Sequence, residues 1–369
     1  MNTLLRQHLA FTIFLVAVTA LVLILPLLAG AQEPPPGQFE GEVDVTEVFL
    51  DVVVTDRQGQ PVPGLQAGDF VVTEDGEPVE VTSVEYYTTR YGAPEAELKP
   101  GEVPASRHFI FFFDDQRFNS TPENRLLPQQ VQAGRQAAEW ARENLQPSDW
   151  AAVLSYDSRL KIHLDFAQDR DAIVEAIEAA SRGGEPRAET SRRGGADAGV
   201  ASLLARLPTG KELSRITPRP YSALTRVAEA VGPIAGRKNL LLFSIGFGQI
   251  DSFTGTARGD ERYYPDMIQA LNDNNVAVYA IDVSTLETRF HSQETFLSQL
   301  ASDTGARYFA PTVSFATPLE QVSEETTGYY LLSYRAQHPR GETGYQRVKV
   351  DTHDNGLRVH ARKGYQFGT

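Results

Sequence analysis

A run of five consecutive apolar residues, Phe109 to Phe113, constrains the fold of this chain more than any other stretch. The run ends directly in two carboxylates, Asp114 and Asp115. A short, unbroken run rich in aromatic and β-branched residues is typical of a strand that is buried on both faces of a parallel sheet. Open α/β sheets hold their ligands in a crevice outside the carboxyl ends of the strands. We therefore expect the two acids to lie at the mouth of such a crevice.

Length and composition limit the class of protein. A chain of 369 residues is long enough for about two domains at ~150 residues each. The net charge of −14 disfavours general nucleic-acid binding, because most of the surface would repel phosphate. The chain has no cysteine, which excludes disulfides, thiolate catalysis and zinc sites with Cys ligands.

The N-terminus has the pattern of an export signal. Arg6 and His8 precede an apolar run over residues 9–28, and Ala29-Gly30-Ala31 fits a small-x-small cleavage site. We predict a signal peptide over residues 1–31. The apolar run is longer than the usual ~7–15 residues of a signal, so an uncleaved membrane anchor through residues 9–28 stays open. In either case the body of the protein would lie outside the cytoplasm, as a periplasmic, extracellular or membrane-anchored protein.

Two sets of strand patterns flank the middle of the chain. Residues 32–42 are rich in proline and predict a stiff linker. Residues 43–90 show apolar side chains mostly at period two, with a hairpin turn predicted over Glu74 to Glu77. Residues 91–105 are rich in Pro and Gly and predict a loop. Strand patterns return over residues 328–369, and we expect the two sets to form one small antiparallel β-sandwich.

Residues 106–327 alternate between strand and helical patterns. Short apolar runs such as Leu240 to Phe243 separate segments in which apolar residues recur at helical spacing. Asp169 and Ser222 stand where they would cap two of the helices. This alternation predicts a doubly wound, mainly parallel α/β sheet with helices on both faces, a Rossmann-like arrangement.

Residues 182–219 do not follow this alternation. They contain two Gly-Gly pairs, and their Lys and Arg residues outnumber Asp and Glu. We expect a solvated, partly flexible insertion. The alternative is a basic contact surface on an otherwise acidic protein, to which Arg192 and Arg193 would belong.

Three stretches carry a resemblance to a known family. They are residues 52–81, residues 235–247 (AGRKNLLLFSIGF), and residues 328–350 with the closing RKGY at 362–365. With residues 106–327 they resemble the secreted bacterial family called acidobacterial VWFA-related proteins, which contain a von Willebrand factor type A domain. The resemblance implies a doubly wound α/β domain in an exported protein, but it does not imply a defined activity.

The resemblance also implies a place for a metal ion. Type A domains commonly bind Mg²⁺ through an Asp-x-Ser-x-Ser loop after the first strand, together with a distant Thr and a distant Asp, and such oxygen ligands suit a hard cation. Asp114 matches the first ligand, but Gln116 and Phe118 occupy the two Ser positions, and Ser244 occupies the place of the second Asp. The residues left to rebuild a site are Asp114, Asp115, Asn119, Ser120, Thr217 and Asp251. We favour a degenerate site in which Asp114 caps the strand end without metal, while Mg²⁺ or Ca²⁺ stays open.

Other catalytic motifs are weak or missing. Gly246-Phe247-Gly248 follows a strand but lacks the third glycine of the dinucleotide fingerprint, so no nucleotide cofactor is expected. The sequence contains no Gly-x-Ser-x-Gly elbow, no HExxH and no Walker lysine loop.

The reading that fits these observations is an exported, non-enzymatic protein-binding or scaffold protein of a bacterial cell envelope. Its partner would be another protein that docks at the carboxyl edge of the sheet, through Asp114, Gln116 and Arg117, with help from Arg192 and Arg193. Membrane contact is expected only if the signal is not cleaved. Two alternatives stay open: a secreted hydrolase that uses carboxylates or a metal-activated water, and a purely structural envelope protein.

Overall fold

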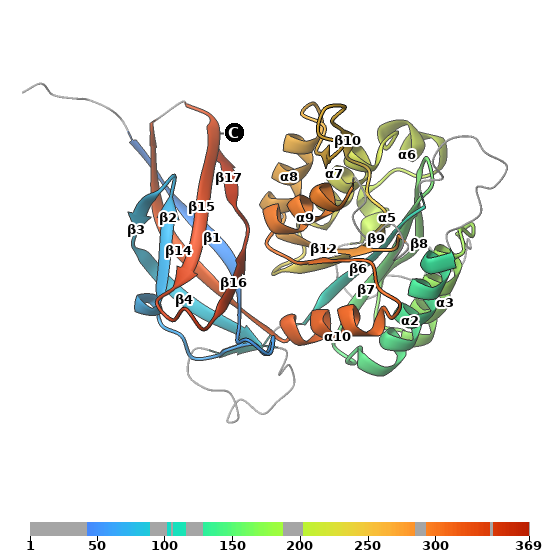
Figure 1. Ribbon diagram of the computed structural model, residues 1–369, viewed down its shortest axis with the longest axis horizontal. Coiled ribbons are helices and arrows are strands. Elements are labelled where there is room, and N and C mark those ends of the chain that lie inside the picture. Colours follow the sequence, from blue (N-terminus) through green and yellow to red (C-terminus); the bar gives the residue numbers. More distant parts are fainter. Residues whose placement is uncertain are drawn as a thin grey trace, which may run out of the picture. The chain divides into compact units, whose positions relative to one another are not determined.

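The computed structural model describes most of the chain beyond the predicted signal and linker (Figure 1). The described residues are 43–88, 102–104, 106–115, 128–186, 202–284, 293–339 and 342–368. Among them, no helix is long and apolar enough to cross a membrane. The predicted signal or anchor at residues 9–28 lies outside the described residues.

The central run forms the middle of a six-stranded sheet with the order β13-β12-β9-β6-β7-β8. The strands are β6 (His108–Asp114), β7 (Trp150–Tyr156), β8 (Leu160–Ala167), β9 (Lys238–Ser244), β12 (Val276–Asp282) and β13 (Tyr308–Phe309). All neighbouring pairs are parallel except β7 and β8, which form an antiparallel hairpin at one edge. The chain fills one side of β6 with β7 and β8 before it crosses to β9 on the other side.

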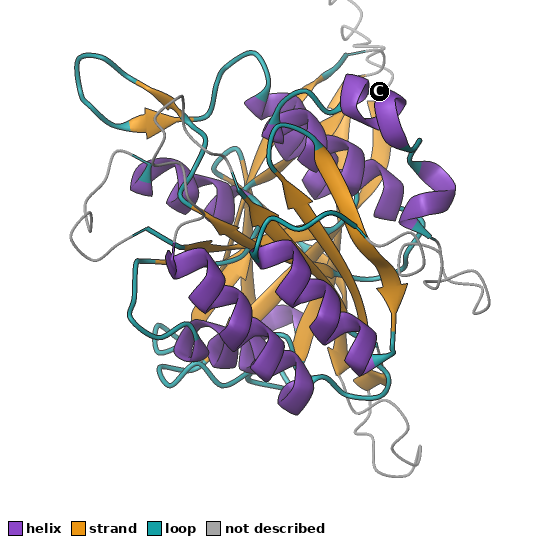
Figure 2. Cartoon of the chain, turned by 90° about the vertical axis from the view of Figure 1, so that its right-hand side faces the viewer, coloured by secondary structure: helices purple, strands orange, loops and turns teal. Residues whose placement is uncertain are grey.

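Helices cover both faces of this sheet, as Figure 2 shows by colour. One layer holds α2 (Pro128–Asn144), α3 (Arg170–Ser181) and α10 (Ala316–Glu325), and the other holds α7 (Pro220–Val231), α8 (Tyr264–Asp273) and α9 (Glu294–Asp303). Alternate residues of β6 enter the two cores: Phe111 packs under the first layer and Phe112 under the second. This burial on both faces explains the unbroken apolar run and confirms the predicted doubly wound α/β class.

The flanking strands form two further sheets that share one core. Their orders are β16-β1-β14-β4-β5 and β17-β15-β2-β3, so each sheet combines strands from both ends of the chain, as the predicted sandwich requires. The strands are β1 (Val43–Thr55), β2 (Phe70–Glu74), β3 (Glu77–Val79), β4 (Val81–Thr88), β5 (Glu102–Pro104), β14 (Gly328–Pro339), β15 (Gly344–Thr352), β16 (Arg358–Ala361) and β17 (Gly364–Phe367); a short 3₁₀ helix, η1, spans Ala67–Asp69.

Local turns of the sandwich agree in part with expectation. The hairpin between β2 and β3 turns at Asp75 and Gly76, whose φ angles of 46° and 94° are both left-handed, as a two-residue type I′ turn requires. The predicted loop over residues 91–105 is wrong at its end, because Glu102–Pro104 pairs in parallel with β4. Proline and glycine composition marked the loop but gave no sign of this short edge pairing.

The two predicted helix caps have different outcomes. Asp169 caps α3 as expected, because its side chain accepts hydrogen bonds from the N–H groups of Asp171 and Ala172. Ser222 is not the N-cap residue of α7, which already begins at Pro220, but its hydroxyl accepts the N–H of the N-cap residue Arg219 at 3.2 Å. Proline suits the first turn of a helix since its φ is already helical and its missing N–H has no partner to lose there.

The prediction of a flexible insertion over residues 182–219 is wrong for its second half. Two short helices, α5 (Leu203–Arg206) and α6 (Gly210–Ile216), follow one another there, and Leu203, Leu207 and Leu213 are buried in the same core as α7. The carboxylate of Asp165 holds α5 in place by accepting hydrogen bonds from the hydroxyl of Ser202 and the N–H of Leu203. Arg192 and Arg193 lie outside the described residues.

Candidate functional site

The carboxyl ends of β6 and β9 form the point where the strand order reverses. Ligands of open α/β sheets bind at such a topological switch point. Here the end of β6 carries Asp114, which is 2% exposed, and the end of β9 carries the buried Ser244. The hydroxyl of Ser244 donates to Oδ2 of Asp114 at 2.5 Å, and Ser244 Oγ accepts the N–H of Gly246 at 2.8 Å. The short O–H···O distance is that of a charge-assisted bond to a carboxylate.

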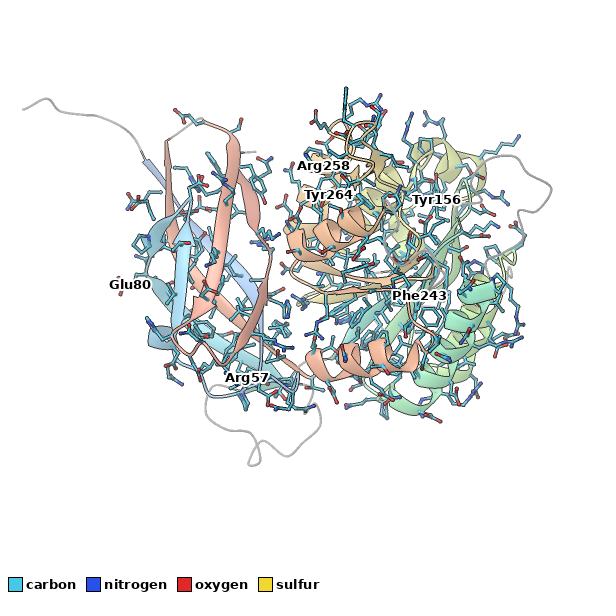
Figure 3. The ribbon with its side chains drawn as sticks, in the orientation of Figure 1. Arg57, Glu80, Tyr156, Phe243, Arg258 and Tyr264 are labelled. Atoms are coloured by element: carbon cyan, nitrogen blue, oxygen red, sulfur yellow. The ribbon has the colours of Figure 1, made fainter. Side chains whose placement is uncertain are left out.

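Asp114 and Ser244 belong to a row of polar side chains across four strands. Tyr156 of β7 is in register with Asp114, and Asp282 of β12 is in register with Ser244. Residues in register on parallel strands point to the same face of the sheet. Burial and the charge of Asp114 raise the pKa of the Tyr156 phenol, and Arg219 opposes this shift, so these three groups interact. Tyr156 and Phe243, which precedes Ser244, mark this part of the sheet in Figure 3.

Asp282 was not among the predicted site residues. It is fully buried, and its carboxylate accepts hydrogen bonds from the hydroxyl of Tyr308 at 2.9 Å and the N–H of Ser284 at 2.9 Å. Its sequence signal is the same as that of Asp114: an apolar strand, Val276 to Ile281, that ends in an acid. The structure therefore places the buried carboxylates of Asp114 and Asp282 on either side of Ser244 at this edge, where Asp115 is buried as well.

Each of the predicted metal ligands that the structure describes takes part in a hydrogen bond within the chain. Asp115 follows Asp114 and donates its N–H to the carbonyl of Tyr156 at 2.7 Å. Thr217 is buried where α6 ends, with its hydroxyl donated to the carbonyl of Leu213 at 2.7 Å. Asp251 lies in the hairpin loop after β10, where the N–H groups of Thr254 and Phe253 bond its carboxylate and lower its pKa. The remaining candidates, Gln116, Arg117, Asn119, Ser120, Arg192 and Arg193, lie outside the described residues.

Acidic and histidine side chains do not cluster among the described residues. Within the described ranges there is no group of three or more His, Asp and Glu side chains that could hold a metal ion. Mg²⁺ demands six oxygen ligands in octahedral geometry. At the switch point the described side chains supply the carboxylate of Asp114 and the hydroxyl of Ser244, which are already bonded to each other.

A buried serine–histidine pair also lies in this sheet. Ser155 Oγ and His163 Nε2 are 2.8 Å apart, and each residue is 2% exposed. Burial lowers the pKa of His163 to about 4, and within the described part of the chain its Nδ1 has no hydrogen-bond partner. A nucleophile–base pair needs access to substrate and a third group that orients the base. The pair therefore links β7 to β8 and does not form a hydrolase dyad.

The outer surface of the carboxyl edge is built by a hairpin that follows β9. Its two short strands are β10 (Gln249–Ile250) and β11 (Ala257–Arg258). Arg258 is labelled in Figure 3. Ile250 and Phe253, on this hairpin, are exposed, by 54% and 97%. Composition alone did not single out this hairpin, because an isolated Phe between polar residues is an ordinary loop sequence.

Comparison with known proteins gives a likeness at the level of the fold. No protein-family model matches the chain, and no curated protein matches it. A von Willebrand factor type A protein from Catenulispora acidiphila is 11% identical, with 86% of this chain and 73% of that chain covered at a TM-score of 0.37.

Two other solved structures are similar over 60% of this chain. An aerotolerance-related membrane protein from Bacteroides fragilis is 8% identical, with 98% of its own chain covered and a TM-score of 0.37. Proximal thread matrix protein 1 of the mussel byssus is 12% identical, with 48% of its chain covered and a TM-score of 0.38. At these scores the likenesses carry no argument, so function has to be argued from the residues of the α/β part.

Proposed function

We propose that this chain is an exported, non-enzymatic protein-binding or scaffold protein that docks a protein partner at the carboxyl edge of its type A-like sheet, without a metal ion. The observation that carries the proposal is the bond between Ser244 and Asp114 at the switch point. The carboxylate that would hold a cation in the type A pattern is held here by a neighbouring hydroxyl. Recognition at this edge then depends on protein surface rather than on an open coordination position.

The burial and the hydrogen bonds of the acids at this edge support binding rather than catalysis. Asp114 and Asp282 are both inaccessible and both accept hydroxyl hydrogen bonds. General acid–base catalysis needs a titratable group within hydrogen-bond reach of a substrate. The side chains that do reach solvent at this edge include the apolar Ile250 and Phe253, which suit contact with another protein. A secreted hydrolase and a purely structural envelope protein remain the alternative functions.

A metal titration tests the metal-free part of the proposal. A metal that binds only the folded state must raise its stability by mass action. We expect no change in the melting temperature of the purified chain with millimolar Mg²⁺, Mn²⁺ or Ca²⁺. A rise in wild type that Asp114→Ala abolishes would instead establish a rebuilt site, completed by residues such as Asn119 and Ser120.

Site-specific photo-crosslinking in the cells that export the chain tests the docking edge. A photoreactive amino acid replaces Ile250 at the carboxyl edge, and a matched one replaces Phe49, a 48% exposed residue of β1 in the sandwich. We expect a discrete cross-linked species from position 250 and none from position 49. Equal yields at both positions, or no species at either, would contradict docking at this edge and favour a structural role.

Testing whether the basic insertion contributes to partner binding requires a deletion narrower than residues 182–219. Removing residues 182–219 would also remove the buried Leu203 and Leu213, so lost binding would only report lost folding. Deleting residues 187–201 leaves those leucines in place. Partner binding that survives both this deletion and Asp114→Ala would remove the basis for placing the partner around Asp114 and the insertion.

A further inference from the structure

The β10–β11 hairpin is held rigidly at both of its ends. The side-chain amide of Gln293 accepts the N–H of Gly248 at 2.7 Å and donates to its carbonyl at 3.1 Å. The hydroxyl of Tyr221 donates to the carbonyl of Phe247 at 3.3 Å and accepts the N–H of Asp260 at 3.2 Å, which joins the two ends. Such a hairpin is fixed in place before any partner arrives.

The loop at the tip of the hairpin is ordered by its own hydrogen bonds. The carboxylate of Asp251 accepts the N–H groups of Phe253 and Thr254 at 2.8 and 3.0 Å, and its carbonyl accepts the N–H of Gly255 at 2.9 Å. The tip nevertheless leaves the Phe253 ring 97% exposed. Aromatic side chains on preorganised loops are the usual anchors of protein interfaces, because little order is lost when they bind.

A hollow of about 220 Å³ lies at the side of the same domain. Its walls carry apolar side chains from the start of β8 and from α5 and α6, namely Leu160, Ile162, Leu204 and Leu213. A cavity of ~150 Å³ lined by aliphatic and aromatic side chains is large enough to bind benzene. The hollow is therefore large enough for a phenyl ring, and polar side chains complete its lining: Arg159, Lys161, Glu185, Thr209 and Ser214.

The hairpin and the hollow belong to the same edge of the sheet. β10 follows the carboxyl end of β9, and β8 begins directly after the carboxyl end of β7. Figure 1 shows β10 and α6 at the same end of the α/β part. Two copies that meet through this edge can each place a tip in the other's hollow, which is the reciprocal contact of a two-fold symmetric dimer.

Each of the two features has a charged residue beside it. Arg258 is exposed on β11, and it forms no ion pair with any residue that the structure describes. Glu185 lies at the rim of the hollow with its side chain 66% exposed, although it also pairs with Arg159 and Lys161. A bilayer is a poorer occupant for the tip, because residues 251–256 contain no Lys or Arg to attract anionic lipid.

We propose that the docking partner is a second copy of this chain, with Phe253 of each copy inserted into the hollow of the other and Arg258 beside Glu185. This inference rests on the proposed binding function and names its partner.

Sedimentation velocity of the purified exported chain at about 1 to 500 µM tests the proposal. We expect a reversible monomer–dimer equilibrium that Phe253→Ala weakens by about 100-fold or more, since both anchors are lost at once. Arg258→Glu should weaken it less. Phe49→Ala removes an equally large, half-exposed ring from the sandwich and should leave the equilibrium unchanged. A monomer at every concentration, or a dimer unaffected by Phe253→Ala, would overturn the inference.

A mixing experiment separates this contact from other causes of dimerisation. Ser214→Trp fills the hollow from its wall, and Thr209→Trp at the exposed rim replaces it if the first variant melts at a lower temperature. Neither Phe253→Ala nor the filled variant should dimerise alone, but their mixture should, because one tip and one open hollow remain. A mixture that stays monomeric would refute the reciprocal contact.

Two further results would also refute the inference and would show which alternative replaces it. Co-sedimentation of wild type, but not Phe253→Ala, with phosphatidylglycerol vesicles would assign the tip to a bilayer. A chain that stays monomeric while position 250 still cross-links to a different protein in cells would remove the self-docking inference and leave the proposed function standing.

Discussion

Replacing Ser244 by Asp would place an acid where the type A pattern has one. Without a metal ion, the structure predicts that this acid repels Asp114 and destabilises the fold. The Ser244 hydroxyl lies 2.5 Å from Asp114 Oδ2, so the new carboxylate would stand within about 4 Å of an existing one. Two unit charges at that separation repel by about 4 kcal/mol at the effective dielectric constant of ~20 that describes protein sites. Loss of the hydroxyl bond adds about 1.5–3 kcal/mol, which Ser244→Ala measures separately.

We expect Ser244→Asp to be less stable than Ser244→Ala by about 2–4 kcal/mol at pH 7 in chelator, from urea unfolding. Repulsion raises the pKa of the pair in the folded state above its value in the unfolded chain. The folded state then holds a proton that the unfolded state releases, so the difference should shrink by about 1.4 kcal/mol for each pH unit as the pH falls. Millimolar Ca²⁺ or Mg²⁺ should reduce the difference in stability between the two variants at pH 7. Equal stability of the two variants from pH 7 to 5 would refute the placement of Asp114 beside Ser244.

Three further predictions concern the supports of this edge. Asp165→Asn exchanges one acceptor oxygen for a donor, so it should lower the free energy of unfolding by about 2–4 kcal/mol and speed amide exchange over residues 202–207. The control is Asp169→Ala, which removes an exposed helix cap and should lower the free energy of unfolding by about 1 kcal/mol. Leu213→Ala should lower the free energy of unfolding by about 2–5 kcal/mol, whereas deletion of residues 187–201 should leave the melting temperature nearly unchanged. An equal loss of stability in the two variants would contradict the packing of α6. Burial lowers the pKa of three histidines from 6.5 to about 4: His108, His163 and His360. Between pH 6.5 and 4 the unfolded chain binds protons at these histidines that the folded chain does not. The free energy of unfolding should therefore fall by about 2 kcal/mol per histidine from pH 7 to 5. In His163→Gln this fall should be smaller by the contribution of one histidine.

The parts of the fold that sequence predicted are those with a strong local pattern. Five apolar residues in a row can only be buried on both faces, so β6 and its place in a parallel sheet followed directly. The alternation around it fixed the doubly wound class. The two-residue turn at Asp75 and Gly76 was equally local, since its left-handed backbone angles select those residue types.

The parts that sequence missed depend on contacts between distant segments. Asp114 and Ser244 meet because β9 is placed next to β6; the family resemblance implied that order, but nothing within either strand reports it. Asp282 had the same apolar run before it as Asp114 but was overlooked because the type A pattern has no ligand there. Leu203 and Leu213 were hidden by the Gly and Arg content of residues 182–219, since composition averages over a segment and a few well-placed leucines decide its packing.

The substitution of a hydroxyl for an acid at Ser244 changes what kind of partner this edge can accept. A bound cation with an open position attracts a partner's carboxylate. Without the cation, the same crevice presents two buried carboxylates, Asp114 and Asp282, on a chain of net charge −14, and would repel an acid. Affinity then has to come from the rim, where Phe253 supplies apolar area and Arg258 supplies an unpaired positive charge among the described residues. Under the proposed function, recognition at this edge would therefore rest on its rim rather than on the centre of the crevice.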